Sequence, residues 1–211
     1  MNNAAPIILN ASDPCSPLSI PPSRTALLLL DFHKFIIASQ PNEGAPVLTA
    51  ASNLRTWAKS LGMLAVHCLI DLQATTAPSR KMASRANAVR ERMAHDPESG
   101  AEHARLAACA NEFVFYRPPS HVSALGSYGL EAFLAEHGIS SLLLAGFSTS
   151  GCVINTAKGA ADRGFVVTVV EDACGDKSPE VHECIVRKLL VGQAHVVDLE
   201  GLRGIWKKVH T

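Results

Sequence analysis

In this chain, short segments that are apolar along their whole length alternate with longer amphipathic segments, and this alternation constrains the fold most. Wholly apolar strands are typical of a sheet buried on both faces, and a helix after each strand predicts parallel pairing. The fold class predicted is therefore α/β, a three-layer α-β-α sandwich with a six-stranded, mainly parallel sheet. The expected strands are Thr25–Asp31, Met63–Ile70, Glu112–Tyr116, Ser140–Ala145, Phe165–Glu171 and Ala194–Leu199. Periodicity leaves the strand order open.

The amphipathic segments predict helices, and residues 25–211 are expected to form one domain. Residues 1–24, rich in Asn, Pro and Ser, are expected to be an irregular lead-in. Glycines follow three of the helical segments where a helix commonly ends. The helices are expected over Pro46–Leu61, Met82–Met93, Leu130–His137, Gly151–Arg163, Pro179–Val191 and Leu202–Val209.

Composition narrows the class of partner. Lys and Arg together number 19, as do Asp and Glu, so the net charge gives no basis for binding nucleic acid or an anionic membrane. The first residues lack the pattern of a signal peptide, and the apolar runs are too short to span a bilayer. We expect a cytoplasmic protein that acts on a small molecule.

The six cysteines are scattered, without a CxxC pair or zinc-ligand spacing, and are expected to be free thiols. They are Cys15, Cys68, Cys109, Cys152, Cys174 and Cys184. The sequence also lacks a Gly-x-Gly-x-x-Gly motif after the first strand and a P-loop. We therefore predict no metal and no nucleotide cofactor.

Reactive side chains follow three of the expected strands. In an open parallel sheet, sites form at the carboxyl ends of the strands, where Asp31, Arg117 and Cys152 occur. Cys152 lies in the first turn of an expected helix, where N–H groups and the helix dipole lower a thiol pKa and can hold an oxyanion. Asp31 could accept the thiol proton. Taken alone, Cys152 is explained equally well by packing, and Asp31 is more commonly a cap of the loop after a strand, but their shared edge of the sheet favours a site.

The segment from Leu144 to Ala157 resembles the nucleophile motif of the isochorismatase-like cysteine hydrolase family. It has Gly, two residues, Thr, two residues, Cys-Val and then Thr-Ala, with the cysteine at Cys152. The strand that ends at Asp31, the run Ser123-Ala-Leu, and Gly164–Ala173 resemble further family motifs, so the resemblance spans roughly residues 25–200.

The resemblance implies a hydrolase with a catalytic triad of Asp, Lys and Cys. It implies a cis peptide bond between Phe147 and Ser148, which would direct the Ser148 and Cys152 N–H groups to one oxyanion. It further implies cleavage of a small amide C–N bond through a Cys152 thioester, and a homo-oligomer, a dimer or tetramer. Phe147, His33 and His121 are expected to contribute to substrate binding.

The sequence departs from the family pattern at the lysine. Arg117 is the basic residue nearest the expected place; it keeps the charge but cannot donate a proton near neutral pH. His121 or Lys34 could reach in instead. Nicotinamidases of the family hold a metal with an Asp and two His after the second strand. Here that stretch begins at His67, expected to point into the packing, and Asp71 is expected in a loop.

Three other functions stay open at this point. Gly146-Phe-Ser148-Thr-Ser-Gly151 nearly matches a serine hydrolase elbow, with His195 as the base it would need. The protein could hydrolyse the isochorismate vinyl ether, or bind a small molecule or a protein without catalysis. The loops that would set specificity, 32–45, 71–85 and 117–128, carry no recognisable signature.

Overall fold

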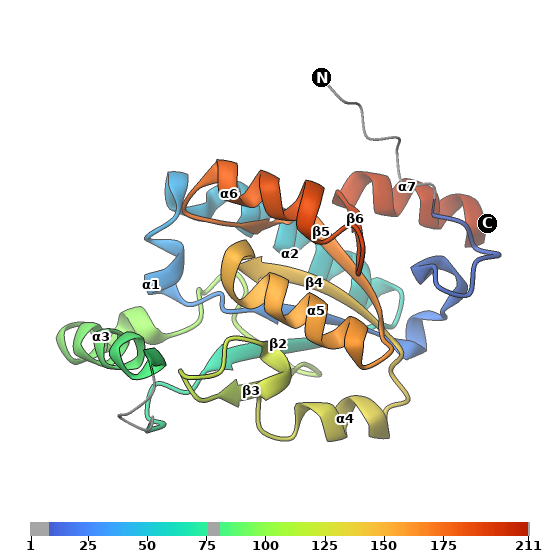
Figure 1. Ribbon diagram of the computed structural model, residues 1–211. Helices are drawn as coiled ribbons and strands as arrows, with labels where there is room; N and C mark the ends of the chain where they lie inside the picture. The colour runs from blue at the N-terminus through green and yellow to red at the C-terminus, as the bar shows by residue number, and fades with distance from the viewer. Residues whose placement is uncertain (1–8, 76–80, 211) are drawn as a thin grey trace.

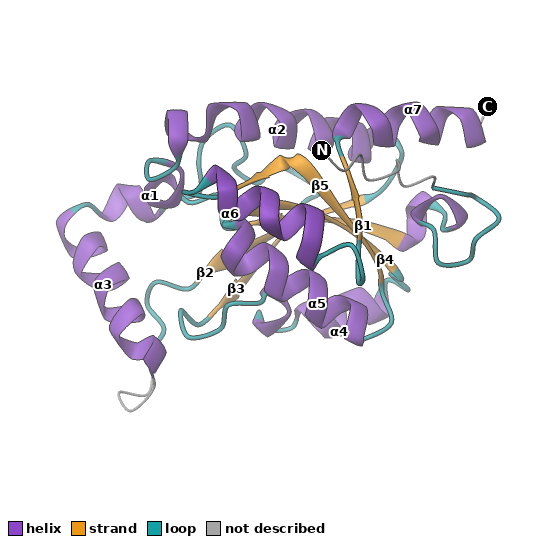
Figure 2. Ribbon diagram, turned by 45° about the horizontal axis from the view of Figure 1, so that its top comes forward, coloured by secondary structure: helices purple, strands orange, loops and turns teal. Residues whose placement is uncertain are grey.

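The expected strands form one six-stranded sheet between two layers of helices (Figures 1 and 2), which confirms the three-layer prediction. A computed structural model describes residues 9–75 and 81–210. The strands are β1 Thr25–Leu30, β2 Leu64–Ile70, β3 Phe113–Arg117, β4 Ser141–Phe147, β5 Val166–Gly175 and β6 His195–Val197.

The sheet has the order β3-β2-β1-β4-β5-β6, and all its neighbouring strands are parallel. The order reverses between β1 and β4, so the loops after these strands diverge to opposite sides and leave a crevice, the usual ligand site of such sheets. Leu30 at the end of β1 is in register with Cys68 on β2 and Gly146 on β4, which brings the strand ends to one edge.

Helices cover both faces of the sheet (Figure 2). One layer contains α2 (Ala45–Ser60) and α7 (Leu199–His210), and the other contains α4 (Leu130–Glu136), α5 (Ile154–Asp162) and α6 (Pro179–Cys184). The wholly apolar sequence of β1 follows from this burial, because alternate residues of the strand enter the two separate cores.

Two of the helices expected from the periodicity contain a π-helical turn in place of regular α-helix at one end. A π-helical turn over Thr149–Val153 precedes α5, and a second over Ile185–Leu189 follows α6. Two helices flank the crevice: α1 (Lys34–Ile37), which the sequence did not predict, and α3 (Lys81–His95). π-Helical turns are rare in proteins overall, but they are often found at functional sites. The turn over Thr149–Val153 contains Cys152.

The lead-in contributes two short 3₁₀ turns, Pro17–Ser19 and Pro22–Arg24. The side chains of Leu9 and Leu18 are buried in the core under α2 and α7. Residues 1–8 lie outside the described stretches. Within the stretches that are described, no helix has the length and apolar character needed to cross a bilayer.

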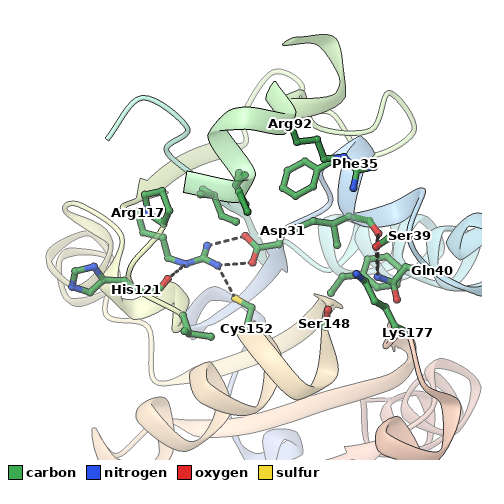
Figure 3. A pocket seen from close by; sticks show the side chains of 17 residues that line it. Asp31, Phe35, Ser39, Gln40, Arg92, Arg117, His121, Ser148, Cys152 and Lys177 are labelled. Atoms are coloured by element: carbon green, nitrogen blue, oxygen red, sulfur yellow. Dashed lines mark hydrogen bonds and ion pairs between the residues drawn. The ribbon is translucent and has the colours of Figure 1, made fainter. Parts of the chain in front are cut away.

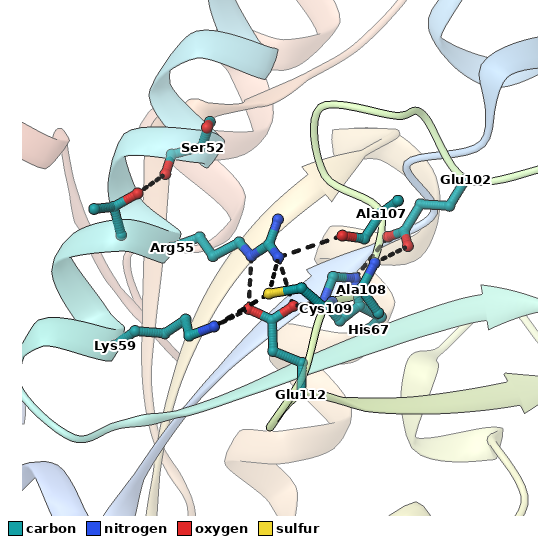
Figure 4. Close-up of polar contacts among 10 residues, drawn as sticks. Ser52, Arg55, Lys59, His67, Glu102, Ala107, Ala108, Cys109 and Glu112 are labelled. Atoms are coloured by element: carbon teal, nitrogen blue, oxygen red, sulfur yellow. Dashed lines mark hydrogen bonds and ion pairs between the residues drawn. The ribbon is translucent and has the colours of Figure 1, made fainter.

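A buried polar cluster anchors the segment before β3 (Figure 4). The Glu112 carboxylate accepts hydrogen bonds from Arg55 Nε at 2.7 Å and Lys59 Nζ at 2.7 Å, both on α2. Burial alone would raise the pKa of Glu112, but these two cations lower it. His67 on β2 is fully buried, with Nδ1 2.7 Å from Glu102 and Nε2 3.2 Å from Glu112. His67 therefore packs inside the protein, as expected, and both of its ring nitrogens lie against carboxylates.

Gly146→Ala tests the close approach of β4 to β1. A Cβ on Gly146 would lie 2.1 Å from the Leu30 carbonyl oxygen, and the φ of 148° is unfavourable for other residues. We expect the free energy of unfolding to fall by about 3 kcal/mol or more. Urea denaturation measures it, with Gly204→Ala, where a Cβ meets nothing within 4 Å, as the matched control. An equal stability of the two variants would contradict the predicted clash.

Candidate active site

Asp31, Arg117 and Cys152 meet at the carboxyl edge of the sheet (Figure 3). Asp31 follows β1, Arg117 is the last residue of β3, and Cys152 follows β4. Their exposed fractions are 4%, 2% and 3%, so the three side chains form a buried cluster. The sequence placed these residues at one sheet edge, and the structure brings them into contact.

Arg117 holds the Asp31 carboxylate with two parallel hydrogen bonds. Its Nη1 donates to Oδ1 at 2.8 Å and its Nη2 to Oδ2 at 2.5 Å, while its Nε donates to the His121 carbonyl at 2.9 Å. Burial alone would lower the pKa of Arg117, but the Cys152 sulfur when it is ionised and the Asp31 carboxylate raise it. Arg117 therefore stays charged and fixes the carboxylate in one orientation.

The backbone of Asp31 is also held in an unusual conformation. Its φ of 56° lies in the left-handed region, which non-glycine residues seldom adopt, and its N–H donates to the Cys68 carbonyl at 3.0 Å. This turn at the end of β1 carries the chain away from the sheet and points the carboxylate into the crevice. Strain of this kind concentrates at functional sites.

Cys152 Sγ lies 3.4 Å from Arg117 Nη2 and 3.7 Å from Thr156 Oγ1. Burial and the Asp31 charge raise the pKa of the Cys152 thiol to about 12, although Arg117 and the Thr156 hydroxyl act to lower it. The sequence expectation of a lowered pKa was wrong, because it considered the helix start and not the depth of the thiol or the carboxylate beside it. The free protein therefore holds a protonated thiol.

The turn before Cys152 is fixed by neighbouring groups. The peptide bond between Phe147 and Ser148 is cis. The N–H of Ser150 donates to the Asp176 carboxylate at 2.7 Å, and Thr149 Oγ1 lies 2.8 Å from His182 Nδ1. Thr156, part of the Thr-Ala motif, accepts a hydrogen bond from the Ala124 N–H at 2.8 Å, which leaves its own hydroxyl proton free for the sulfur.

His33 does not line the pocket, contrary to the sequence expectation. The ring is buried: its Nδ1–H donates to the Gly100 carbonyl at 2.7 Å, and its Nε2 accepts from the Ile70 N–H at 3.0 Å. Burial lowers the pKa of His33, consistent with the neutral ring that these bonds require. The His33 ring therefore connects the loop after β1 to β2 and to the segment beyond α3.

The pocket above the triad has a volume of about 290 Å³. Phe147 and His121, which were expected to contribute to substrate binding, line it together with Ser148. Lys34 does not reach it and instead pairs with Glu98 at 3.5 Å. His195 lies on β6 with its ring bonded to the Cys15 carbonyl, so it does not serve a serine nucleophile.

The lining also includes Phe35, Gln40, Arg92 and Lys177, none of which was singled out from the sequence. Lys177 comes two residues after β5, so the search of strand ends could have found it. Phe35 and Gln40 lie in the segment 32–45, which was expected to set specificity, whereas Arg92 lies on α3, where no sequence signal marks a pocket. Among the described residues, no three His, Cys, Asp or Glu side chains are placed to hold a metal ion.

Comparison of the sequence with known proteins finds a matching family model and similar relatives. Residues 25–201 match the model of the isochorismatase domain. Maleamate amidohydrolase of Pseudomonas putida is 29% identical over 164 residues, which cover 76% of each chain. Nicotinamidase 3 of Arabidopsis thaliana is 32% identical over 81 residues, which cover 38% of this chain and 41% of the relative.

Solved structures share the fold. A cysteine hydrolase from Pseudomonas syringae superposes with a TM-score of 0.74 at 15% identity, covering 90% of this chain and 96% of the other. N-carbamoylsarcosine amidase from Thermoplasma acidophilum gives a TM-score of 0.63 at 20% identity, covering 83% and 96%.

His33→Phe tests the structural role of this ring. The Ile70 N–H and the Gly100 carbonyl would lose their partners inside the protein, so we expect the free energy of unfolding to fall by about 2–4 kcal/mol. Urea denaturation at pH 7.5 measures the loss, and the same change at the exposed His137 is the control. Equal stability of both variants would contradict the structural role.

Alkylation of Cys152 tests which neighbouring groups raise and which lower the pKa of its thiol. Removing the Asp31 charge lowers the thiol pKa, so Asp31→Asn should speed the reaction with iodoacetamide at pH 8. Thr156→Val removes a hydrogen bond that lowers the pKa, so alkylation should slow. Mass spectrometry of the Cys152 peptide separates it from the exposed cysteines. Changes of the same sign in both variants would indicate a general loosening and contradict this account.

Proposed function

This chain belongs to the isochorismatase family of hydrolases, and from that we propose that it cleaves the C–N bond of a small amide through a thioester on Cys152. The observation that supports this most is Arg117, whose guanidinium contacts both the Asp31 carboxylate and the Cys152 sulfur at the base of the pocket. Two relatives, maleamate amidohydrolase and nicotinamidase 3, are amidases by name, which supports amide chemistry.

In the first step, Asp31 is the base. Because the thiol is protonated in the free protein, the Asp31 carboxylate accepts its proton as Sγ attacks the amide carbon. The C–S bond forms and the carbonyl electrons move to the oxygen. Asp31 then returns the proton to the nitrogen, the C–N bond breaks, and the amine leaves behind an acyl thioester.

The backbone N–H groups of Ser148 and Cys152 are the proposed donors to the oxyanion. Both belong to the turn between β4 and α5, beside the sulfur, and Ser148 lines the pocket. Backbone donors fixed before the reaction stabilise the charge that develops on the oxygen without reorganising. A donor set of this kind typically contributes a few kcal/mol to the lowering of the barrier.

In the second step, water replaces the amine. Asp31 takes a proton from the water as the water oxygen attacks the thioester carbon. The C–S bond then breaks, the acid is released, and the sulfur recovers a proton from Asp31. Arg117 remains charged throughout, because a guanidinium does not release its proton near neutral pH. Its role is to orient Asp31 and to stabilise the sulfur when it carries negative charge.

Cys152→Ala and Asp31→Asn test the proposal on a panel of small amides. Loss of the nucleophile should lower kcat/KM by at least about 10³-fold, and loss of the base by about 10²–10⁴-fold. Released amine is measured, and Cys184→Ala, which changes an exposed cysteine, is the matched control.

Two results would contradict the proposal. Full activity of Cys152→Ala toward isochorismate would favour vinyl ether hydrolysis, which needs no thioester. Absence of turnover on the whole panel by the unaltered protein, with ligand binding retained, would favour a family member that binds without catalysis.

A further inference from the structure

The pocket wall carries unbalanced positive charge. Asp31 and Arg117 neutralise each other. Two more cations, Arg92 and Lys177, also line the pocket, and neither pairs with an acid among the described residues. Asp31 is the only carboxylate among the lining residues that the structure describes. Any ligand that fills this cavity therefore meets two uncompensated positive charges.

The two cations come from different parts of the fold. Lys177 follows β5, and Figure 3 shows it beside Gln40 and Ser148, on the side of the proposed oxyanion donors. Arg92 belongs to α3, and its guanidinium carbon lies 5.8 Å from the centre of the Phe35 ring. Both are exposed, so their heads can reach a ligand without the loss of a bond to a protein carboxylate.

Gln40 adds an unused acceptor. Its side chain is 6% exposed, and its Nε2 donates to the Ile36 carbonyl at 3.0 Å. Its Oε1 has no hydrogen-bond partner in the described structure. A buried amide oxygen without a partner costs free energy, which a ligand N–H or O–H group would recover. This wall of the pocket therefore suits a ligand with both a donor and a negative charge.

We propose that the substrate is a small amide that carries a carboxylate, bound chiefly by Lys177, with Arg92 adding to the attraction. The inference rests on the proposed amide hydrolysis and narrows its substrate class. A volume of about 290 Å³ is at the small end of ligand pockets, which favours a small substrate. An uncharged amide of the same size would leave both cations without a counter-ion.

Binding of small ligands to the Cys152→Ala variant tests the preference of the pocket for a negative charge, because this variant should not turn the ligands over. Calorimetry compares succinamate, with its carboxylate on the acyl part, and N-acetylglycine, with its carboxylate on the leaving group, against succinamide and N-acetylglycinamide. We expect an acid to bind about tenfold more tightly than its neutral partner, with the difference shrinking at 0.5 M salt. The acid that binds more tightly locates the carboxylate.

Lys177→Met should remove most of this preference and Lys177→Glu should reverse it, while Lys158→Met, an exposed lysine of α5, should leave it intact. Neutral amides that bind as tightly as the acids, or equal effects at Lys177 and Lys158, would overturn the inference. Selective binding of an acid without turnover by the unaltered protein would instead refute the amide hydrolysis. Cys152-dependent cleavage of acids and neutral amides alike would refute only the charge selection.

Discussion

The ion pair between Asp31 and Arg117 is the interaction on which the rest of the site depends. Two charges buried together are tolerated only when their geometry is good and their other hydrogen-bonding groups are satisfied. Here the guanidinium uses two parallel bonds to the carboxylate and a third to the His121 carbonyl. Removal of either partner would leave a charge buried alone, at a cost of about 3–5 kcal/mol. The pair therefore holds the end of β1 to the end of β3 and fixes the orientation of Asp31, the proposed base.

Cys152 is subject to opposing influences whose balance decides its resting state. Burial and Asp31 favour the thiol, whereas Arg117 and Thr156 favour the thiolate. The helix start is less positive than its position suggests, because the Asp176 carboxylate already accepts the Ser150 N–H. Since the thiol prevails, the proposed mechanism requires that the thiolate form only as its proton moves to Asp31. An arginine in place of the family lysine suits this scheme, because it supplies charge and no proton.

The fold and the three central residues could be predicted because they depend on simple regularities. Apolar strands alternate with helices, and reactive residues follow the strands at one edge. The errors have physical causes. His33 follows β1 as a pocket residue would, but its ring turns back to satisfy the backbone of Ile70 and Gly100. Gln40 and Arg92 reach the pocket from outside the strand ends, where neither periodicity nor a motif marks them.

The three central side chains come from β1, β3 and the turn after β4, with separations of 86 residues between Asp31 and Arg117 and 35 between Arg117 and Cys152. No local segment contains two of them in contact, so the cluster exists only after β2 and β3 have joined one side of β1 and β4 the other. Contacts this distant in sequence form late and slowly in folding. If the three residues act as proposed, activity would return during refolding only once β1, β2, β3 and β4 have assembled, and it would report on that part of the sheet.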